Sequence, residues 1–565
     1  MRLTVDRHSG VPMYRQLAAQ LRESIVSGAL AEGYRLPPER ELAARLEVNR
    51  TTVLQAYQQL KDEGLIASKV GKGTFVLPAT SAASATSGTT VASVPPASVD
   101  ATGATALSAS QASTRVGSVV DAGIVSAKDR GTRSASGTGR SAVHTIRDGL
   151  SGETSAEPPA IRPPWSILFS DYSNRFTYHD IAEADRAQRG GSGGRDDARP
   201  HPIDFATGSP NPADIPDDLL RAVSLEAFAS HEFDGQPESP IEGFDELRDL
   251  LAKHMRDRGV GCDARNVMVL SGSEQGIDLI VRAFVNPGDC VLVEQSTFFP
   301  ALQTFRSADA RIVGVPVDGD GMRTDLLEGY CARFHPKLIY TIPTFHNPTG
   351  TTMPIERRRT LVDVARRYQC LIVEDDAYGD LWYGDGHRPI PLAGMENTGY
   401  VMYLSTFSKT VTSGLRTGWV VADPHVIARL AALRRMVDQH TSTSSQRICL
   451  ELLKEGRIAG HVASLAAAYR TRRDVILDAL ERYMPHDMRW TRPQGGYYIW
   501  ATLPGGVRAL DLLGRCRARG VTFMPGGVFD VDESDDAHIR LNMVRPDAAD
   551  LERGIQVIGE SLNAM

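Results

Sequence analysis

A single lysine, Lys409, lies among hydroxyl residues in the segment Ser405 to Gly418, which reads STFSKTVTSGLRTG. A lysine that forms a Schiff base with pyridoxal phosphate (PLP) needs such surroundings, because the 5′-phosphate of the cofactor must be held next to its aldehyde carbon. Thr406 can donate a hydroxyl to that phosphate, and Arg416 can bind it with a guanidinium fork. A lysine among hydroxyls is more often simply solvated, so the hypothesis depends on other segments.

Two turns that follow apolar runs could hold further parts of the same cofactor. The segment Val269 to Ile277, VLSGSEQGI, predicts a strand, a tight turn and a helix whose first backbone N–H groups, at Ser273 and Glu274, could bind phosphate. The segment Thr341 to Gly350, TIPTFHNPTG, places Asn347 where its amide could hydrogen-bond the phenolate O3′. The alternatives are an ordinary strand–helix turn and an Asx turn before proline.

Acidic and aromatic residues at two strand ends complete the cofactor hypothesis. The segment Leu371 to Tyr378, LIVEDDAY, ends an apolar strand with carboxylates. Asp375 could keep the pyridinium nitrogen protonated, which makes PLP an electron sink, and Tyr378 could donate to O3′. Phe298, after the run VLVEQSTF, could stack on the ring. The alternatives are solvated strand-end carboxylates and a core aromatic residue.

An arginine within an apolar run is a candidate for binding substrate. Arg540 lies in the segment HIRLNM, residues 538–543, which predicts a strand. A charge in such a place needs a partner, and a substrate carboxylate is a natural bidentate one. A structural salt bridge is the alternative.

Composition limits the classes of protein that the chain can belong to. Its 565 residues are too many for one core, and 42% hydrophobic and 23% charged residues are typical of a globular protein. The net charge is −7, but residues 1–76 carry +3, which is compatible with a small DNA-binding module on an acidic body. No CxxC pair, signal core or long apolar run is present, which argues against a disulfide scaffold, a zinc site and a membrane span and favours the cytoplasm.

Sequence complexity predicts two folded regions joined by a long flexible linker. Residues 10–78 are patterned, whereas 79–200 are dominated by small and polar residues that bury too little apolar surface to fold. An aromatic stretch from Trp165 to Tyr178 interrupts this linker and could be a docking segment. From 201 to 565, helix and strand patterns alternate as in an α/β domain.

The first region shows the pattern of a winged helix-turn-helix. Apolar residues recur every four positions over 17–25, which predicts a first helix. Pro37 and Pro38 are expected to open a second helix, and Asn49 to cap a third. Residues 65–76, LIASKVGKGTFV, predict a β-hairpin wing.

The amino end of the third helix is the end that enters the major groove in such modules, and wing lysines can meet phosphates. A helical protein-interaction module is the alternative. The predicted DNA contacts are Arg35, Glu39, Arg40, Asn49, Arg50, Thr51, Thr52, Lys69 and Lys72.

Both regions resemble known families. Residues Leu36 to Ile66, LPPERELAARLEVNRTTVLQAYQQLKDEGLI, resemble the GntR family of bacterial regulators over nearly all of 10–77. From Pro202 onward the chain resembles the fold-type I aminotransferases, with GFDELRDLLAKHMRDRGV, QGGYYIW and MPGGVF among the shared runs. This resemblance implies a PLP-dependent transferase fold with Lys409 as the Schiff-base lysine and Asp375 as the pyridinium partner. It also implies O3′ contacts from Asn347 and Tyr378, phosphate contacts from Ser273, Glu274, Thr406 and Arg416, and Arg540 on the amino-acid carboxylate.

The combination resembles the MocR family of bacterial transcription regulators. That resemblance implies a regulator that binds double-stranded DNA and PLP, responds to an amino acid or amine, and forms a head-to-tail homodimer. The runs HNPTG and EDDAYGDLWY are closer to working aminotransferases, so transamination of a 2-amino acid is the alternative function. A third hypothesis makes the body only a dimerisation platform and predicts no cofactor absorbance.

Overall fold

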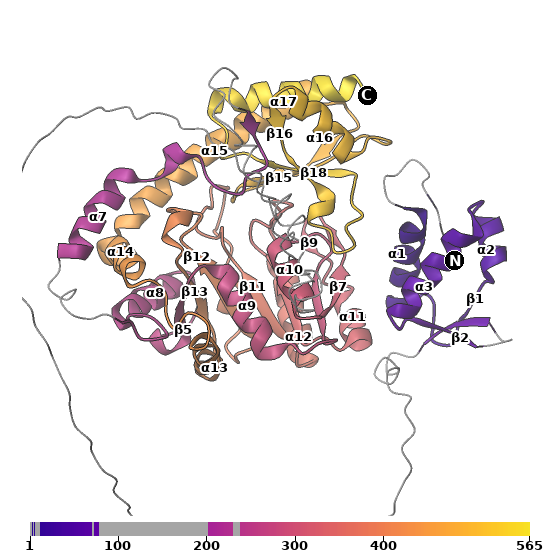
Figure 1. Ribbon diagram of the computed structural model, residues 1–565, viewed down its shortest axis with the longest axis horizontal. Helices are drawn as coiled ribbons and strands as arrows, with labels where there is room; N and C mark the ends of the chain where they lie inside the picture. Colours follow the sequence, from indigo (N-terminus) through magenta and orange to yellow (C-terminus); the bar gives the residue numbers. More distant parts are fainter. Residues whose placement is uncertain (1–2, 4, 6–11, 70–72, 78–201, 230–237) are drawn as a thin grey trace, which may run out of the picture. The chain divides into compact units, whose positions relative to one another are not determined.

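The computed structural model describes residues 3, 5, 12–69, 73–77, 202–229 and 238–565 (Figure 1). The predicted linker at 79–200, its stretch from Trp165 to Tyr178, and Lys72 lie outside the described residues.

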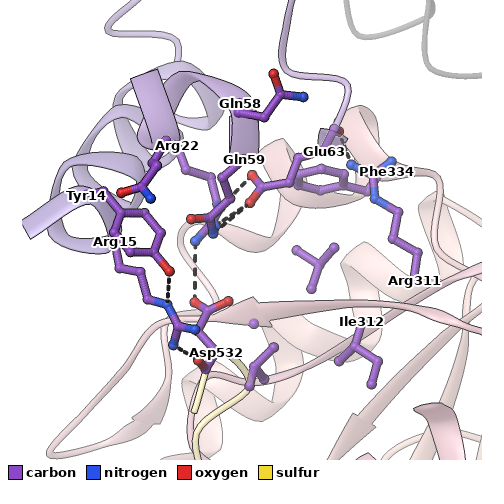
Figure 2. Close-up of a pocket in the computed structure, with 14 residues that line it drawn as sticks. Tyr14, Arg15, Arg22, Gln58, Gln59, Glu63, Arg311, Ile312, Phe334 and Asp532 are labelled. Carbon is purple, nitrogen blue, oxygen red and sulfur yellow. Dashed lines mark hydrogen bonds and ion pairs between the residues drawn. The ribbon is translucent and has the colours of Figure 1, made fainter. Parts of the chain in front are cut away.

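The amino-terminal module is a winged helix-turn-helix. Its helices are α1 (Met13–Val26), α2 (Glu39–Arg45) and α3 (Arg50–Asp62), and its strands β1 (Arg35–Leu36), β2 (Ile66–Lys69) and β3 (Gly73–Val76) pair in the order β1-β3-β2. Leu17, Leu21 and Ile25 are buried as their four-residue spacing predicts. An ion pair from Arg22 to Glu63, with Nε and Oε2 2.9 Å apart, joins α1 to the end of α3 (Figure 2).

Two details of this module differ from the sequence-based expectation. The second helix begins at Glu39, with Pro38 in extended backbone as its N-cap, so neither Pro37 nor Pro38 is helical. The wing has a third strand, β1, because Arg35 and Leu36 pair with Phe75 and Thr74. A two-residue strand carries no readable alternation, which is why the sequence did not indicate it.

The body is built on a seven-stranded sheet. Antiparallel pairing joins β13 to both of its neighbours, and all other neighbours in the sheet run parallel. In sheet order the strands are β5 (Val267–Leu270), β13 (Gly418–Val421), β12 (Val401–Thr406), β11 (Leu371–Asp375), β10 (Leu338–Thr341), β6 (Cys290–Glu294) and β7 (Arg311–Val315).

Helices cover both faces of this sheet, as the α/β pattern predicts (Figure 1). Alternate strand residues point to opposite faces, so Ile372 packs with one set of helices and Val373 with the other. One set is α8 (Asp245–Asp257), α11 (Leu327–Phe334) and α12 (Ile355–Arg367). The other set is α9 (Ser273–Phe284), α10 (Phe299–Ser307) and α13 (Pro424–Arg434).

A smaller sheet with the order β14-β15-β18-β17 forms the carboxy-terminal part of the body, and a long helix, α15, leads into it. Its elements are β14 (Arg489–Trp490), β15 (Tyr498–Thr502), β17 (Met524–Pro525), β18 (His538–Asn542), α15 (Arg457–Tyr483), α16 (Ala509–Ala518) and α17 (Ala548–Asn563). The remaining elements are β4 (Ile203–Asp204), which pairs with β16 (Val521–Thr522), together with α7 (Asp217–Ala229), α14 (Thr443–Leu453), β8 (Val317–Asp318) and β9 (Gly321–Met322). Short 3₁₀ turns occur at Pro212–Asp214, Ala264–Asn266, Leu392–Gly394, Ser413–Leu415, Lys454–Gly456 and Gly526–Val528.

Candidate functional site

Five strands of the large sheet end at one edge, and each is followed by a residue of the predicted site. β5, β6, β10, β11 and β12 all point in the same direction, because β13 is antiparallel to both β12 and β5. Loops after the carboxyl ends of parallel strands meet at the same edge of a sheet, which is where ligands bind in open α/β folds. Segments far apart in the sequence therefore form one site.

A pocket of about 100 Å³ lies at this edge. All nine residues predicted to bind the cofactor line it, namely Ser273, Glu274, Phe298, Asn347, Asp375, Tyr378, Thr406, Lys409 and Arg416. Gly272, Ile342, Ala377, Ser408 and Ser413 complete the lining. The structure thus brings the predicted residues together, while the contact of each with a cofactor remains a prediction.

Lys409 is one of the residues that line this pocket. Its Nζ donates to the backbone oxygen of Gly208 over 2.7 Å and lies 5.7 Å from the ring centre of Tyr378. The Tyr497 hydroxyl donates to the Lys409 backbone oxygen over 2.5 Å, which fixes the main chain beneath the amine. Among the described residues, the amine thus donates one hydrogen bond, to the Gly208 oxygen, and a ligand in the pocket could replace that oxygen as its partner.

The part of the lining around the start of α9 has the features that the predicted phosphate site needs. α9 begins at Ser273, so its first N–H groups are free of helical acceptors. Gly272 has φ of +100°, and a Cβ built on it would lie 2.9 Å from Nη2 of Arg416. Glycine there lets the guanidinium approach the turn closely, and the hydroxyls of Thr406 and Ser408, 2.9 Å apart, line the same pocket.

Asp375 lines the same pocket and has one carboxylate oxygen without a hydrogen-bond partner among the described residues. Its Oδ2 accepts a hydrogen bond of 2.7 Å from the Tyr340 hydroxyl, whereas its buried Oδ1 has no hydrogen-bond partner among the described residues. Burial raises the pKa of Asp375 to about 7, although the hydrogen bond from Tyr340 acts in the opposite direction. A buried acceptor of this kind needs a donor from a ligand.

Arg540 lies beside the pocket and is buried. It donates to Asn347 Oδ1 over 3.0 Å and to the backbone oxygen of Ala206 over 2.6 Å. Its guanidinium carbon lies between two aromatic rings, 4.1 Å from the centre of Tyr498 and 4.7 Å from that of Phe529. Its buried Nε has no hydrogen-bond partner among the described residues, which favours the prediction of a substrate carboxylate over a structural salt bridge.

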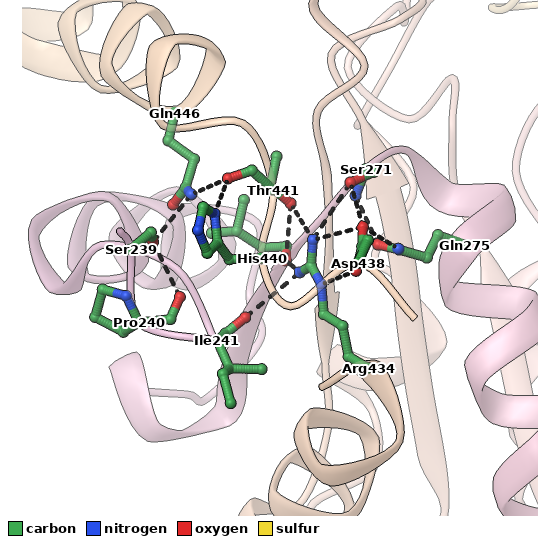
Figure 3. A network of polar contacts seen from close by, with 11 residues as sticks. Ser239, Pro240, Ile241, Ser271, Gln275, Arg434, Asp438, His440, Thr441 and Gln446 are labelled. Carbon is green, nitrogen blue, oxygen red and sulfur yellow. Dashed lines mark hydrogen bonds and ion pairs between the residues drawn. The ribbon is translucent and has the colours of Figure 1, made fainter. Parts of the chain in front are cut away.

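A polar network holds the turn that precedes α9 (Figure 3). Asp438 accepts hydrogen bonds from Ser271 Oγ, from Gln275 Nε2 and from the buried guanidinium of Arg434. Arg434 also donates to the backbone oxygen of Val269, at the end of β5. Although burial acts in the opposite direction, the hydrogen bonds from Arg434 and Gln275 hold the pKa of Asp438 below its usual value. The ion pair of Arg434 and Asp438 therefore holds the turn that precedes α9 in place.

In the amino-terminal module, the start of α3 carries four of the predicted DNA contacts: Asn49, Arg50, Thr51 and Thr52. Asn49 caps this helix, since its side chain accepts from the backbone N–H of Thr51 over 3.0 Å. Arg50 is exposed and forms an ion pair of 3.1 Å with Glu39, which opens α2. Arg35, Arg40, Thr51 and Lys69 are exposed and Thr52 is half-buried. Glu39 is thus placed to orient Arg50. The contacts of all these side chains with DNA stay predictions.

Neither a metal cluster nor a membrane span occurs in the described ranges. Residues 12–69, 73–77, 202–229 and 238–565 contain no group of three or more His, Cys, Asp or Glu residues placed to hold a metal ion. No helix in those ranges combines the length and apolar character that a membrane span needs. The cysteines Cys262, Cys290, Cys331, Cys370, Cys449 and Cys516 are all free thiols.

Three side chains at the site were not predicted. Tyr340 donates a hydrogen bond to Asp375. Tyr498 accepts a 3.1 Å hydrogen bond from Tyr378 and packs on Arg540. Arg434 binds Asp438 and so supports the turn that precedes α9. The alternation of β10 could have placed Tyr340 on the face that Asp375 shares, had the neighbouring strand been known. Tyr498 lies in the segment QGGYYIW, which indicated a family resemblance but no role for this residue.

Comparisons with known proteins agree with this architecture. Residues 207–558 match the family described as aminotransferase class I and II, and residues 13–76 match the bacterial regulatory proteins of the gntR family. Aromatic-amino-acid aminotransferase 1 of Thermococcus litoralis is 37% identical over 366 residues, which are 64% of this chain and 88% of that protein.

A second relative spans both regions, and a solved structure matches the body. The probable rhizopine catabolism regulatory protein MocR of Rhizobium meliloti is 28% identical over 93% of this chain and 88% of its own length. The crystal structure of Pyrococcus horikoshii kynurenine aminotransferase with PMP superposes with a TM-score of 0.66 and 32% identity, covering 71% of this chain and 98% of that chain.

Proposed function

The chain belongs to the aminotransferase class I and II family, and from that premise we propose that it is a PLP-dependent, amino-acid- or amine-responsive transcription regulator that binds double-stranded DNA. The single observation that carries the proposal is the fusion of a complete candidate cofactor pocket to a winged helix-turn-helix of the GntR type. The relative named MocR shares this combination over nearly its whole length.

The pocket fits PLP in two independent respects. The bare, buried Oδ1 of Asp375 suits a protonated ring nitrogen, which is a donor. The turn at Gly272, with Arg416 against it and the start of α9 behind it, suits a phosphate. Phe298 and Tyr378 add aromatic rings to the lining of the same pocket.

The roles proposed for individual residues follow from these positions. When bound, PLP supplies an electron sink for chemistry at the carbon that carries the amino group. Lys409 supplies the amine that holds the cofactor aldehyde, Asn347 and Tyr378 bind O3′, and Arg540 binds the carboxylate of an amino-acid ligand. Ser273, Glu274, Thr406 and Arg416 hold the phosphate. An amino compound that reaches Lys409 competes with it for the cofactor, and this exchange is the event that a regulator can sense.

A spectroscopic titration tests the proposal. The purified full-length protein is loaded with PLP and its visible absorption is followed during addition of single amino acids and amines. We expect one compound to shift the band without sustained keto-acid release, and the same compound to change affinity for the cognate DNA by about tenfold or more, a typical allosteric coupling. A protein that shows no visible band with PLP would contradict the proposal.

Aminotransferase activity is the second candidate function. It is favoured by the presence of Lys409, Asp375, Asn347 and Arg540 in one site and by the 37% identity to an aminotransferase. Continuous keto-acid release from the compound that shifts the band, with a keto-acid acceptor, would establish this function. DNA affinity that does not change with that compound would then remove the regulatory one.

Replacing Arg50 with alanine tests the DNA half of the proposal. Arg50 is exposed at the start of α3 and is held by Glu39, so we expect it to contact a base edge. R50A is expected to weaken binding to the cognate site by about 1–3 kcal/mol while changing binding to random DNA far less. Fluorescence anisotropy at two salt concentrations measures both affinities.

The matched control for Arg50 is Arg265, which is also exposed and paired with an acid, Asp263, but lies in the body. R265A should leave both DNA affinities unchanged. If R50A lowers specific and random binding by the same factor, Arg50 contacts only phosphate.

The remaining proposals concern organisation. We propose the division into a DNA-binding domain at 10–78, a linker at 79–200 and a PLP-binding domain at 201–565, acting as a head-to-tail homodimer. Leu225 and Phe228 of α7 are 68% and 50% exposed, which gives the body an apolar surface that a second copy could cover. A monomeric mass in light scattering would contradict the dimer.

A further inference from the structure

Three consecutive carboxylates end β11, and each has a different partner. Glu374 accepts backbone N–H groups of Leu392 and Ala393 over 2.8 and 2.9 Å. Asp376 forms a buried ion pair with Arg258, with Nη2 and Oδ2 2.8 Å apart. Asp375 alone among the three lines the cofactor pocket, and the side chain that bonds it is a neutral phenol.

That phenol, Tyr340, is in a rigid position. It is fully buried on β10, on the same face of the sheet as Val373, with its ring edge-on to Phe305 at 5.7 Å. The strand register pairs Tyr340 with Val373, and side chains two residues apart point to the same face, so its hydroxyl reaches forward to Asp375. Burial and the neighbouring Asp375 raise the pKa of Tyr340 well above its usual value, so the hydroxyl stays a donor.

We propose that Tyr340 is a positioning residue for the cofactor ring: its hydroxyl fixes Oδ2 of Asp375 and thereby aims Oδ1 at the ring nitrogen. The carboxylate is a rigid planar group that rotates as a unit. A hydrogen bond that holds one of its oxygens therefore also restricts where the other oxygen points. Oδ1 is the atom left without a partner among the described residues. This inference rests on the cofactor and not on whether the protein regulates or catalyses.

The same hydrogen bond favours the charged form of Asp375. Among the described residues, the ionisable groups that act on this carboxyl include Asp376, Glu274, Tyr378, Lys409 and Tyr340. Burial first, and then Asp376 and Glu274, raise the pKa of Asp375, while Tyr340 and Lys409 lower it. Loss of the Tyr340 hydroxyl therefore makes Asp375 easier to protonate near neutral pH, where only its charged form pairs with a protonated ring nitrogen.

The test compares Y340F with Y403F. Tyr403 is a matched control because it is equally buried, lies on the adjoining strand β12 and donates to the next carboxylate, Asp376, over 3.0 Å. Two quantities are measured for each full-length variant: the dissociation constant of PLP, by equilibrium dialysis, and the pH midpoint of the visible band of the bound cofactor. Neither readout depends on turnover.

We expect Y340F to bind PLP roughly tenfold more weakly, as is typical for loss of a hydrogen bond to a charged group. The pH midpoint should rise by about one unit, because a less positive ring withdraws less charge from the nitrogen of Lys409. Y403F should stay within about twofold of the parent protein for binding, since its hydroxyl does not touch Asp375. Equal changes in Y340F and Y403F, or no change in Y340F, would overturn the proposal.

A second comparison is made in the D375N background. If Tyr340 acts through Asp375, adding Y340F to D375N should weaken PLP binding by less than about twofold, because the two changes remove the same interaction. A further tenfold loss would show that Tyr340 acts by another route. Should Y340F fail to fold, recovery of the fold in the double variant would support the coupling, and loss of the fold in both would show that Tyr340 is only a core residue.

Discussion

Replacing Lys409 with alanine is expected to abolish covalent retention of PLP completely. Its Nζ donates a hydrogen bond of 2.7 Å to the Gly208 oxygen, and among the described residues it is the one lysine that lines the pocket. After loading with PLP and reduction with borohydride, the parent protein should carry the added mass on the peptide that contains Lys409. K409A should carry none, and its visible band should be lost.

Two variants make this experiment selective. K409R keeps the positive charge but supplies no reactive amine, so it should also fail to retain cofactor, which separates covalent chemistry from charge. Lys253 is exposed on α8 and lies outside the pocket lining, so K253A should be labelled like the parent protein. A reduced adduct that persists in K409A would place the reactive lysine elsewhere and refute the assignment of this site.

Much of the site could be predicted because its residues lie at the ends of strands or a few residues beyond them. Lys409, Asn347 and Asp375 come after apolar runs, and in a sheet with parallel strands the ends of such runs converge. The order of strands did not have to be known for these residues to meet. The same argument explains why the pocket contains all nine predicted residues although they span Ser273 to Arg416.

What could not be predicted depends on which elements are neighbours. Tyr340 reads as one more apolar residue of a strand until β11 is known to lie beside β10 in a register that brings Asp375 within reach. The burial of Arg434 could not be predicted for the same reason. In the sequence it is the last residue of a helix and stands next to a second arginine, Arg435, as exposed arginines often do. The burial of Arg434 arises from contact with Val269, which is 165 residues away. Periodicity reports the face of an element and not what packs against it.

Replacing Arg434 with alanine is expected to cost about 3 kcal/mol of unfolding free energy, the lower end of the range for breaking a buried ion pair. The Arg434 side chain is fully buried, so its loss removes one donor from the Val269 oxygen, removes the donor to the Thr441 hydroxyl and takes away the cation paired with Asp438. The Val269 oxygen keeps a longer hydrogen bond of 3.4 Å from the Thr441 hydroxyl. The Asp438 side chain is 32% exposed, and the water that reaches it keeps the cost from being larger. Urea denaturation of the full-length protein, followed by tryptophan fluorescence, measures the change.

The control for this variant is the adjacent residue. Arg435 is exposed on the same helix end, and R435A should change the unfolding free energy by no more than about 0.5 kcal/mol. Asp438 also accepts hydrogen bonds from Ser271 and Gln275 on either side of Gly272. R434A should therefore loosen the turn at Gly272 and weaken PLP binding even where the protein remains folded. If R434A is destabilised but binds PLP like the parent protein, the network supports the fold and does not position the anion-binding turn.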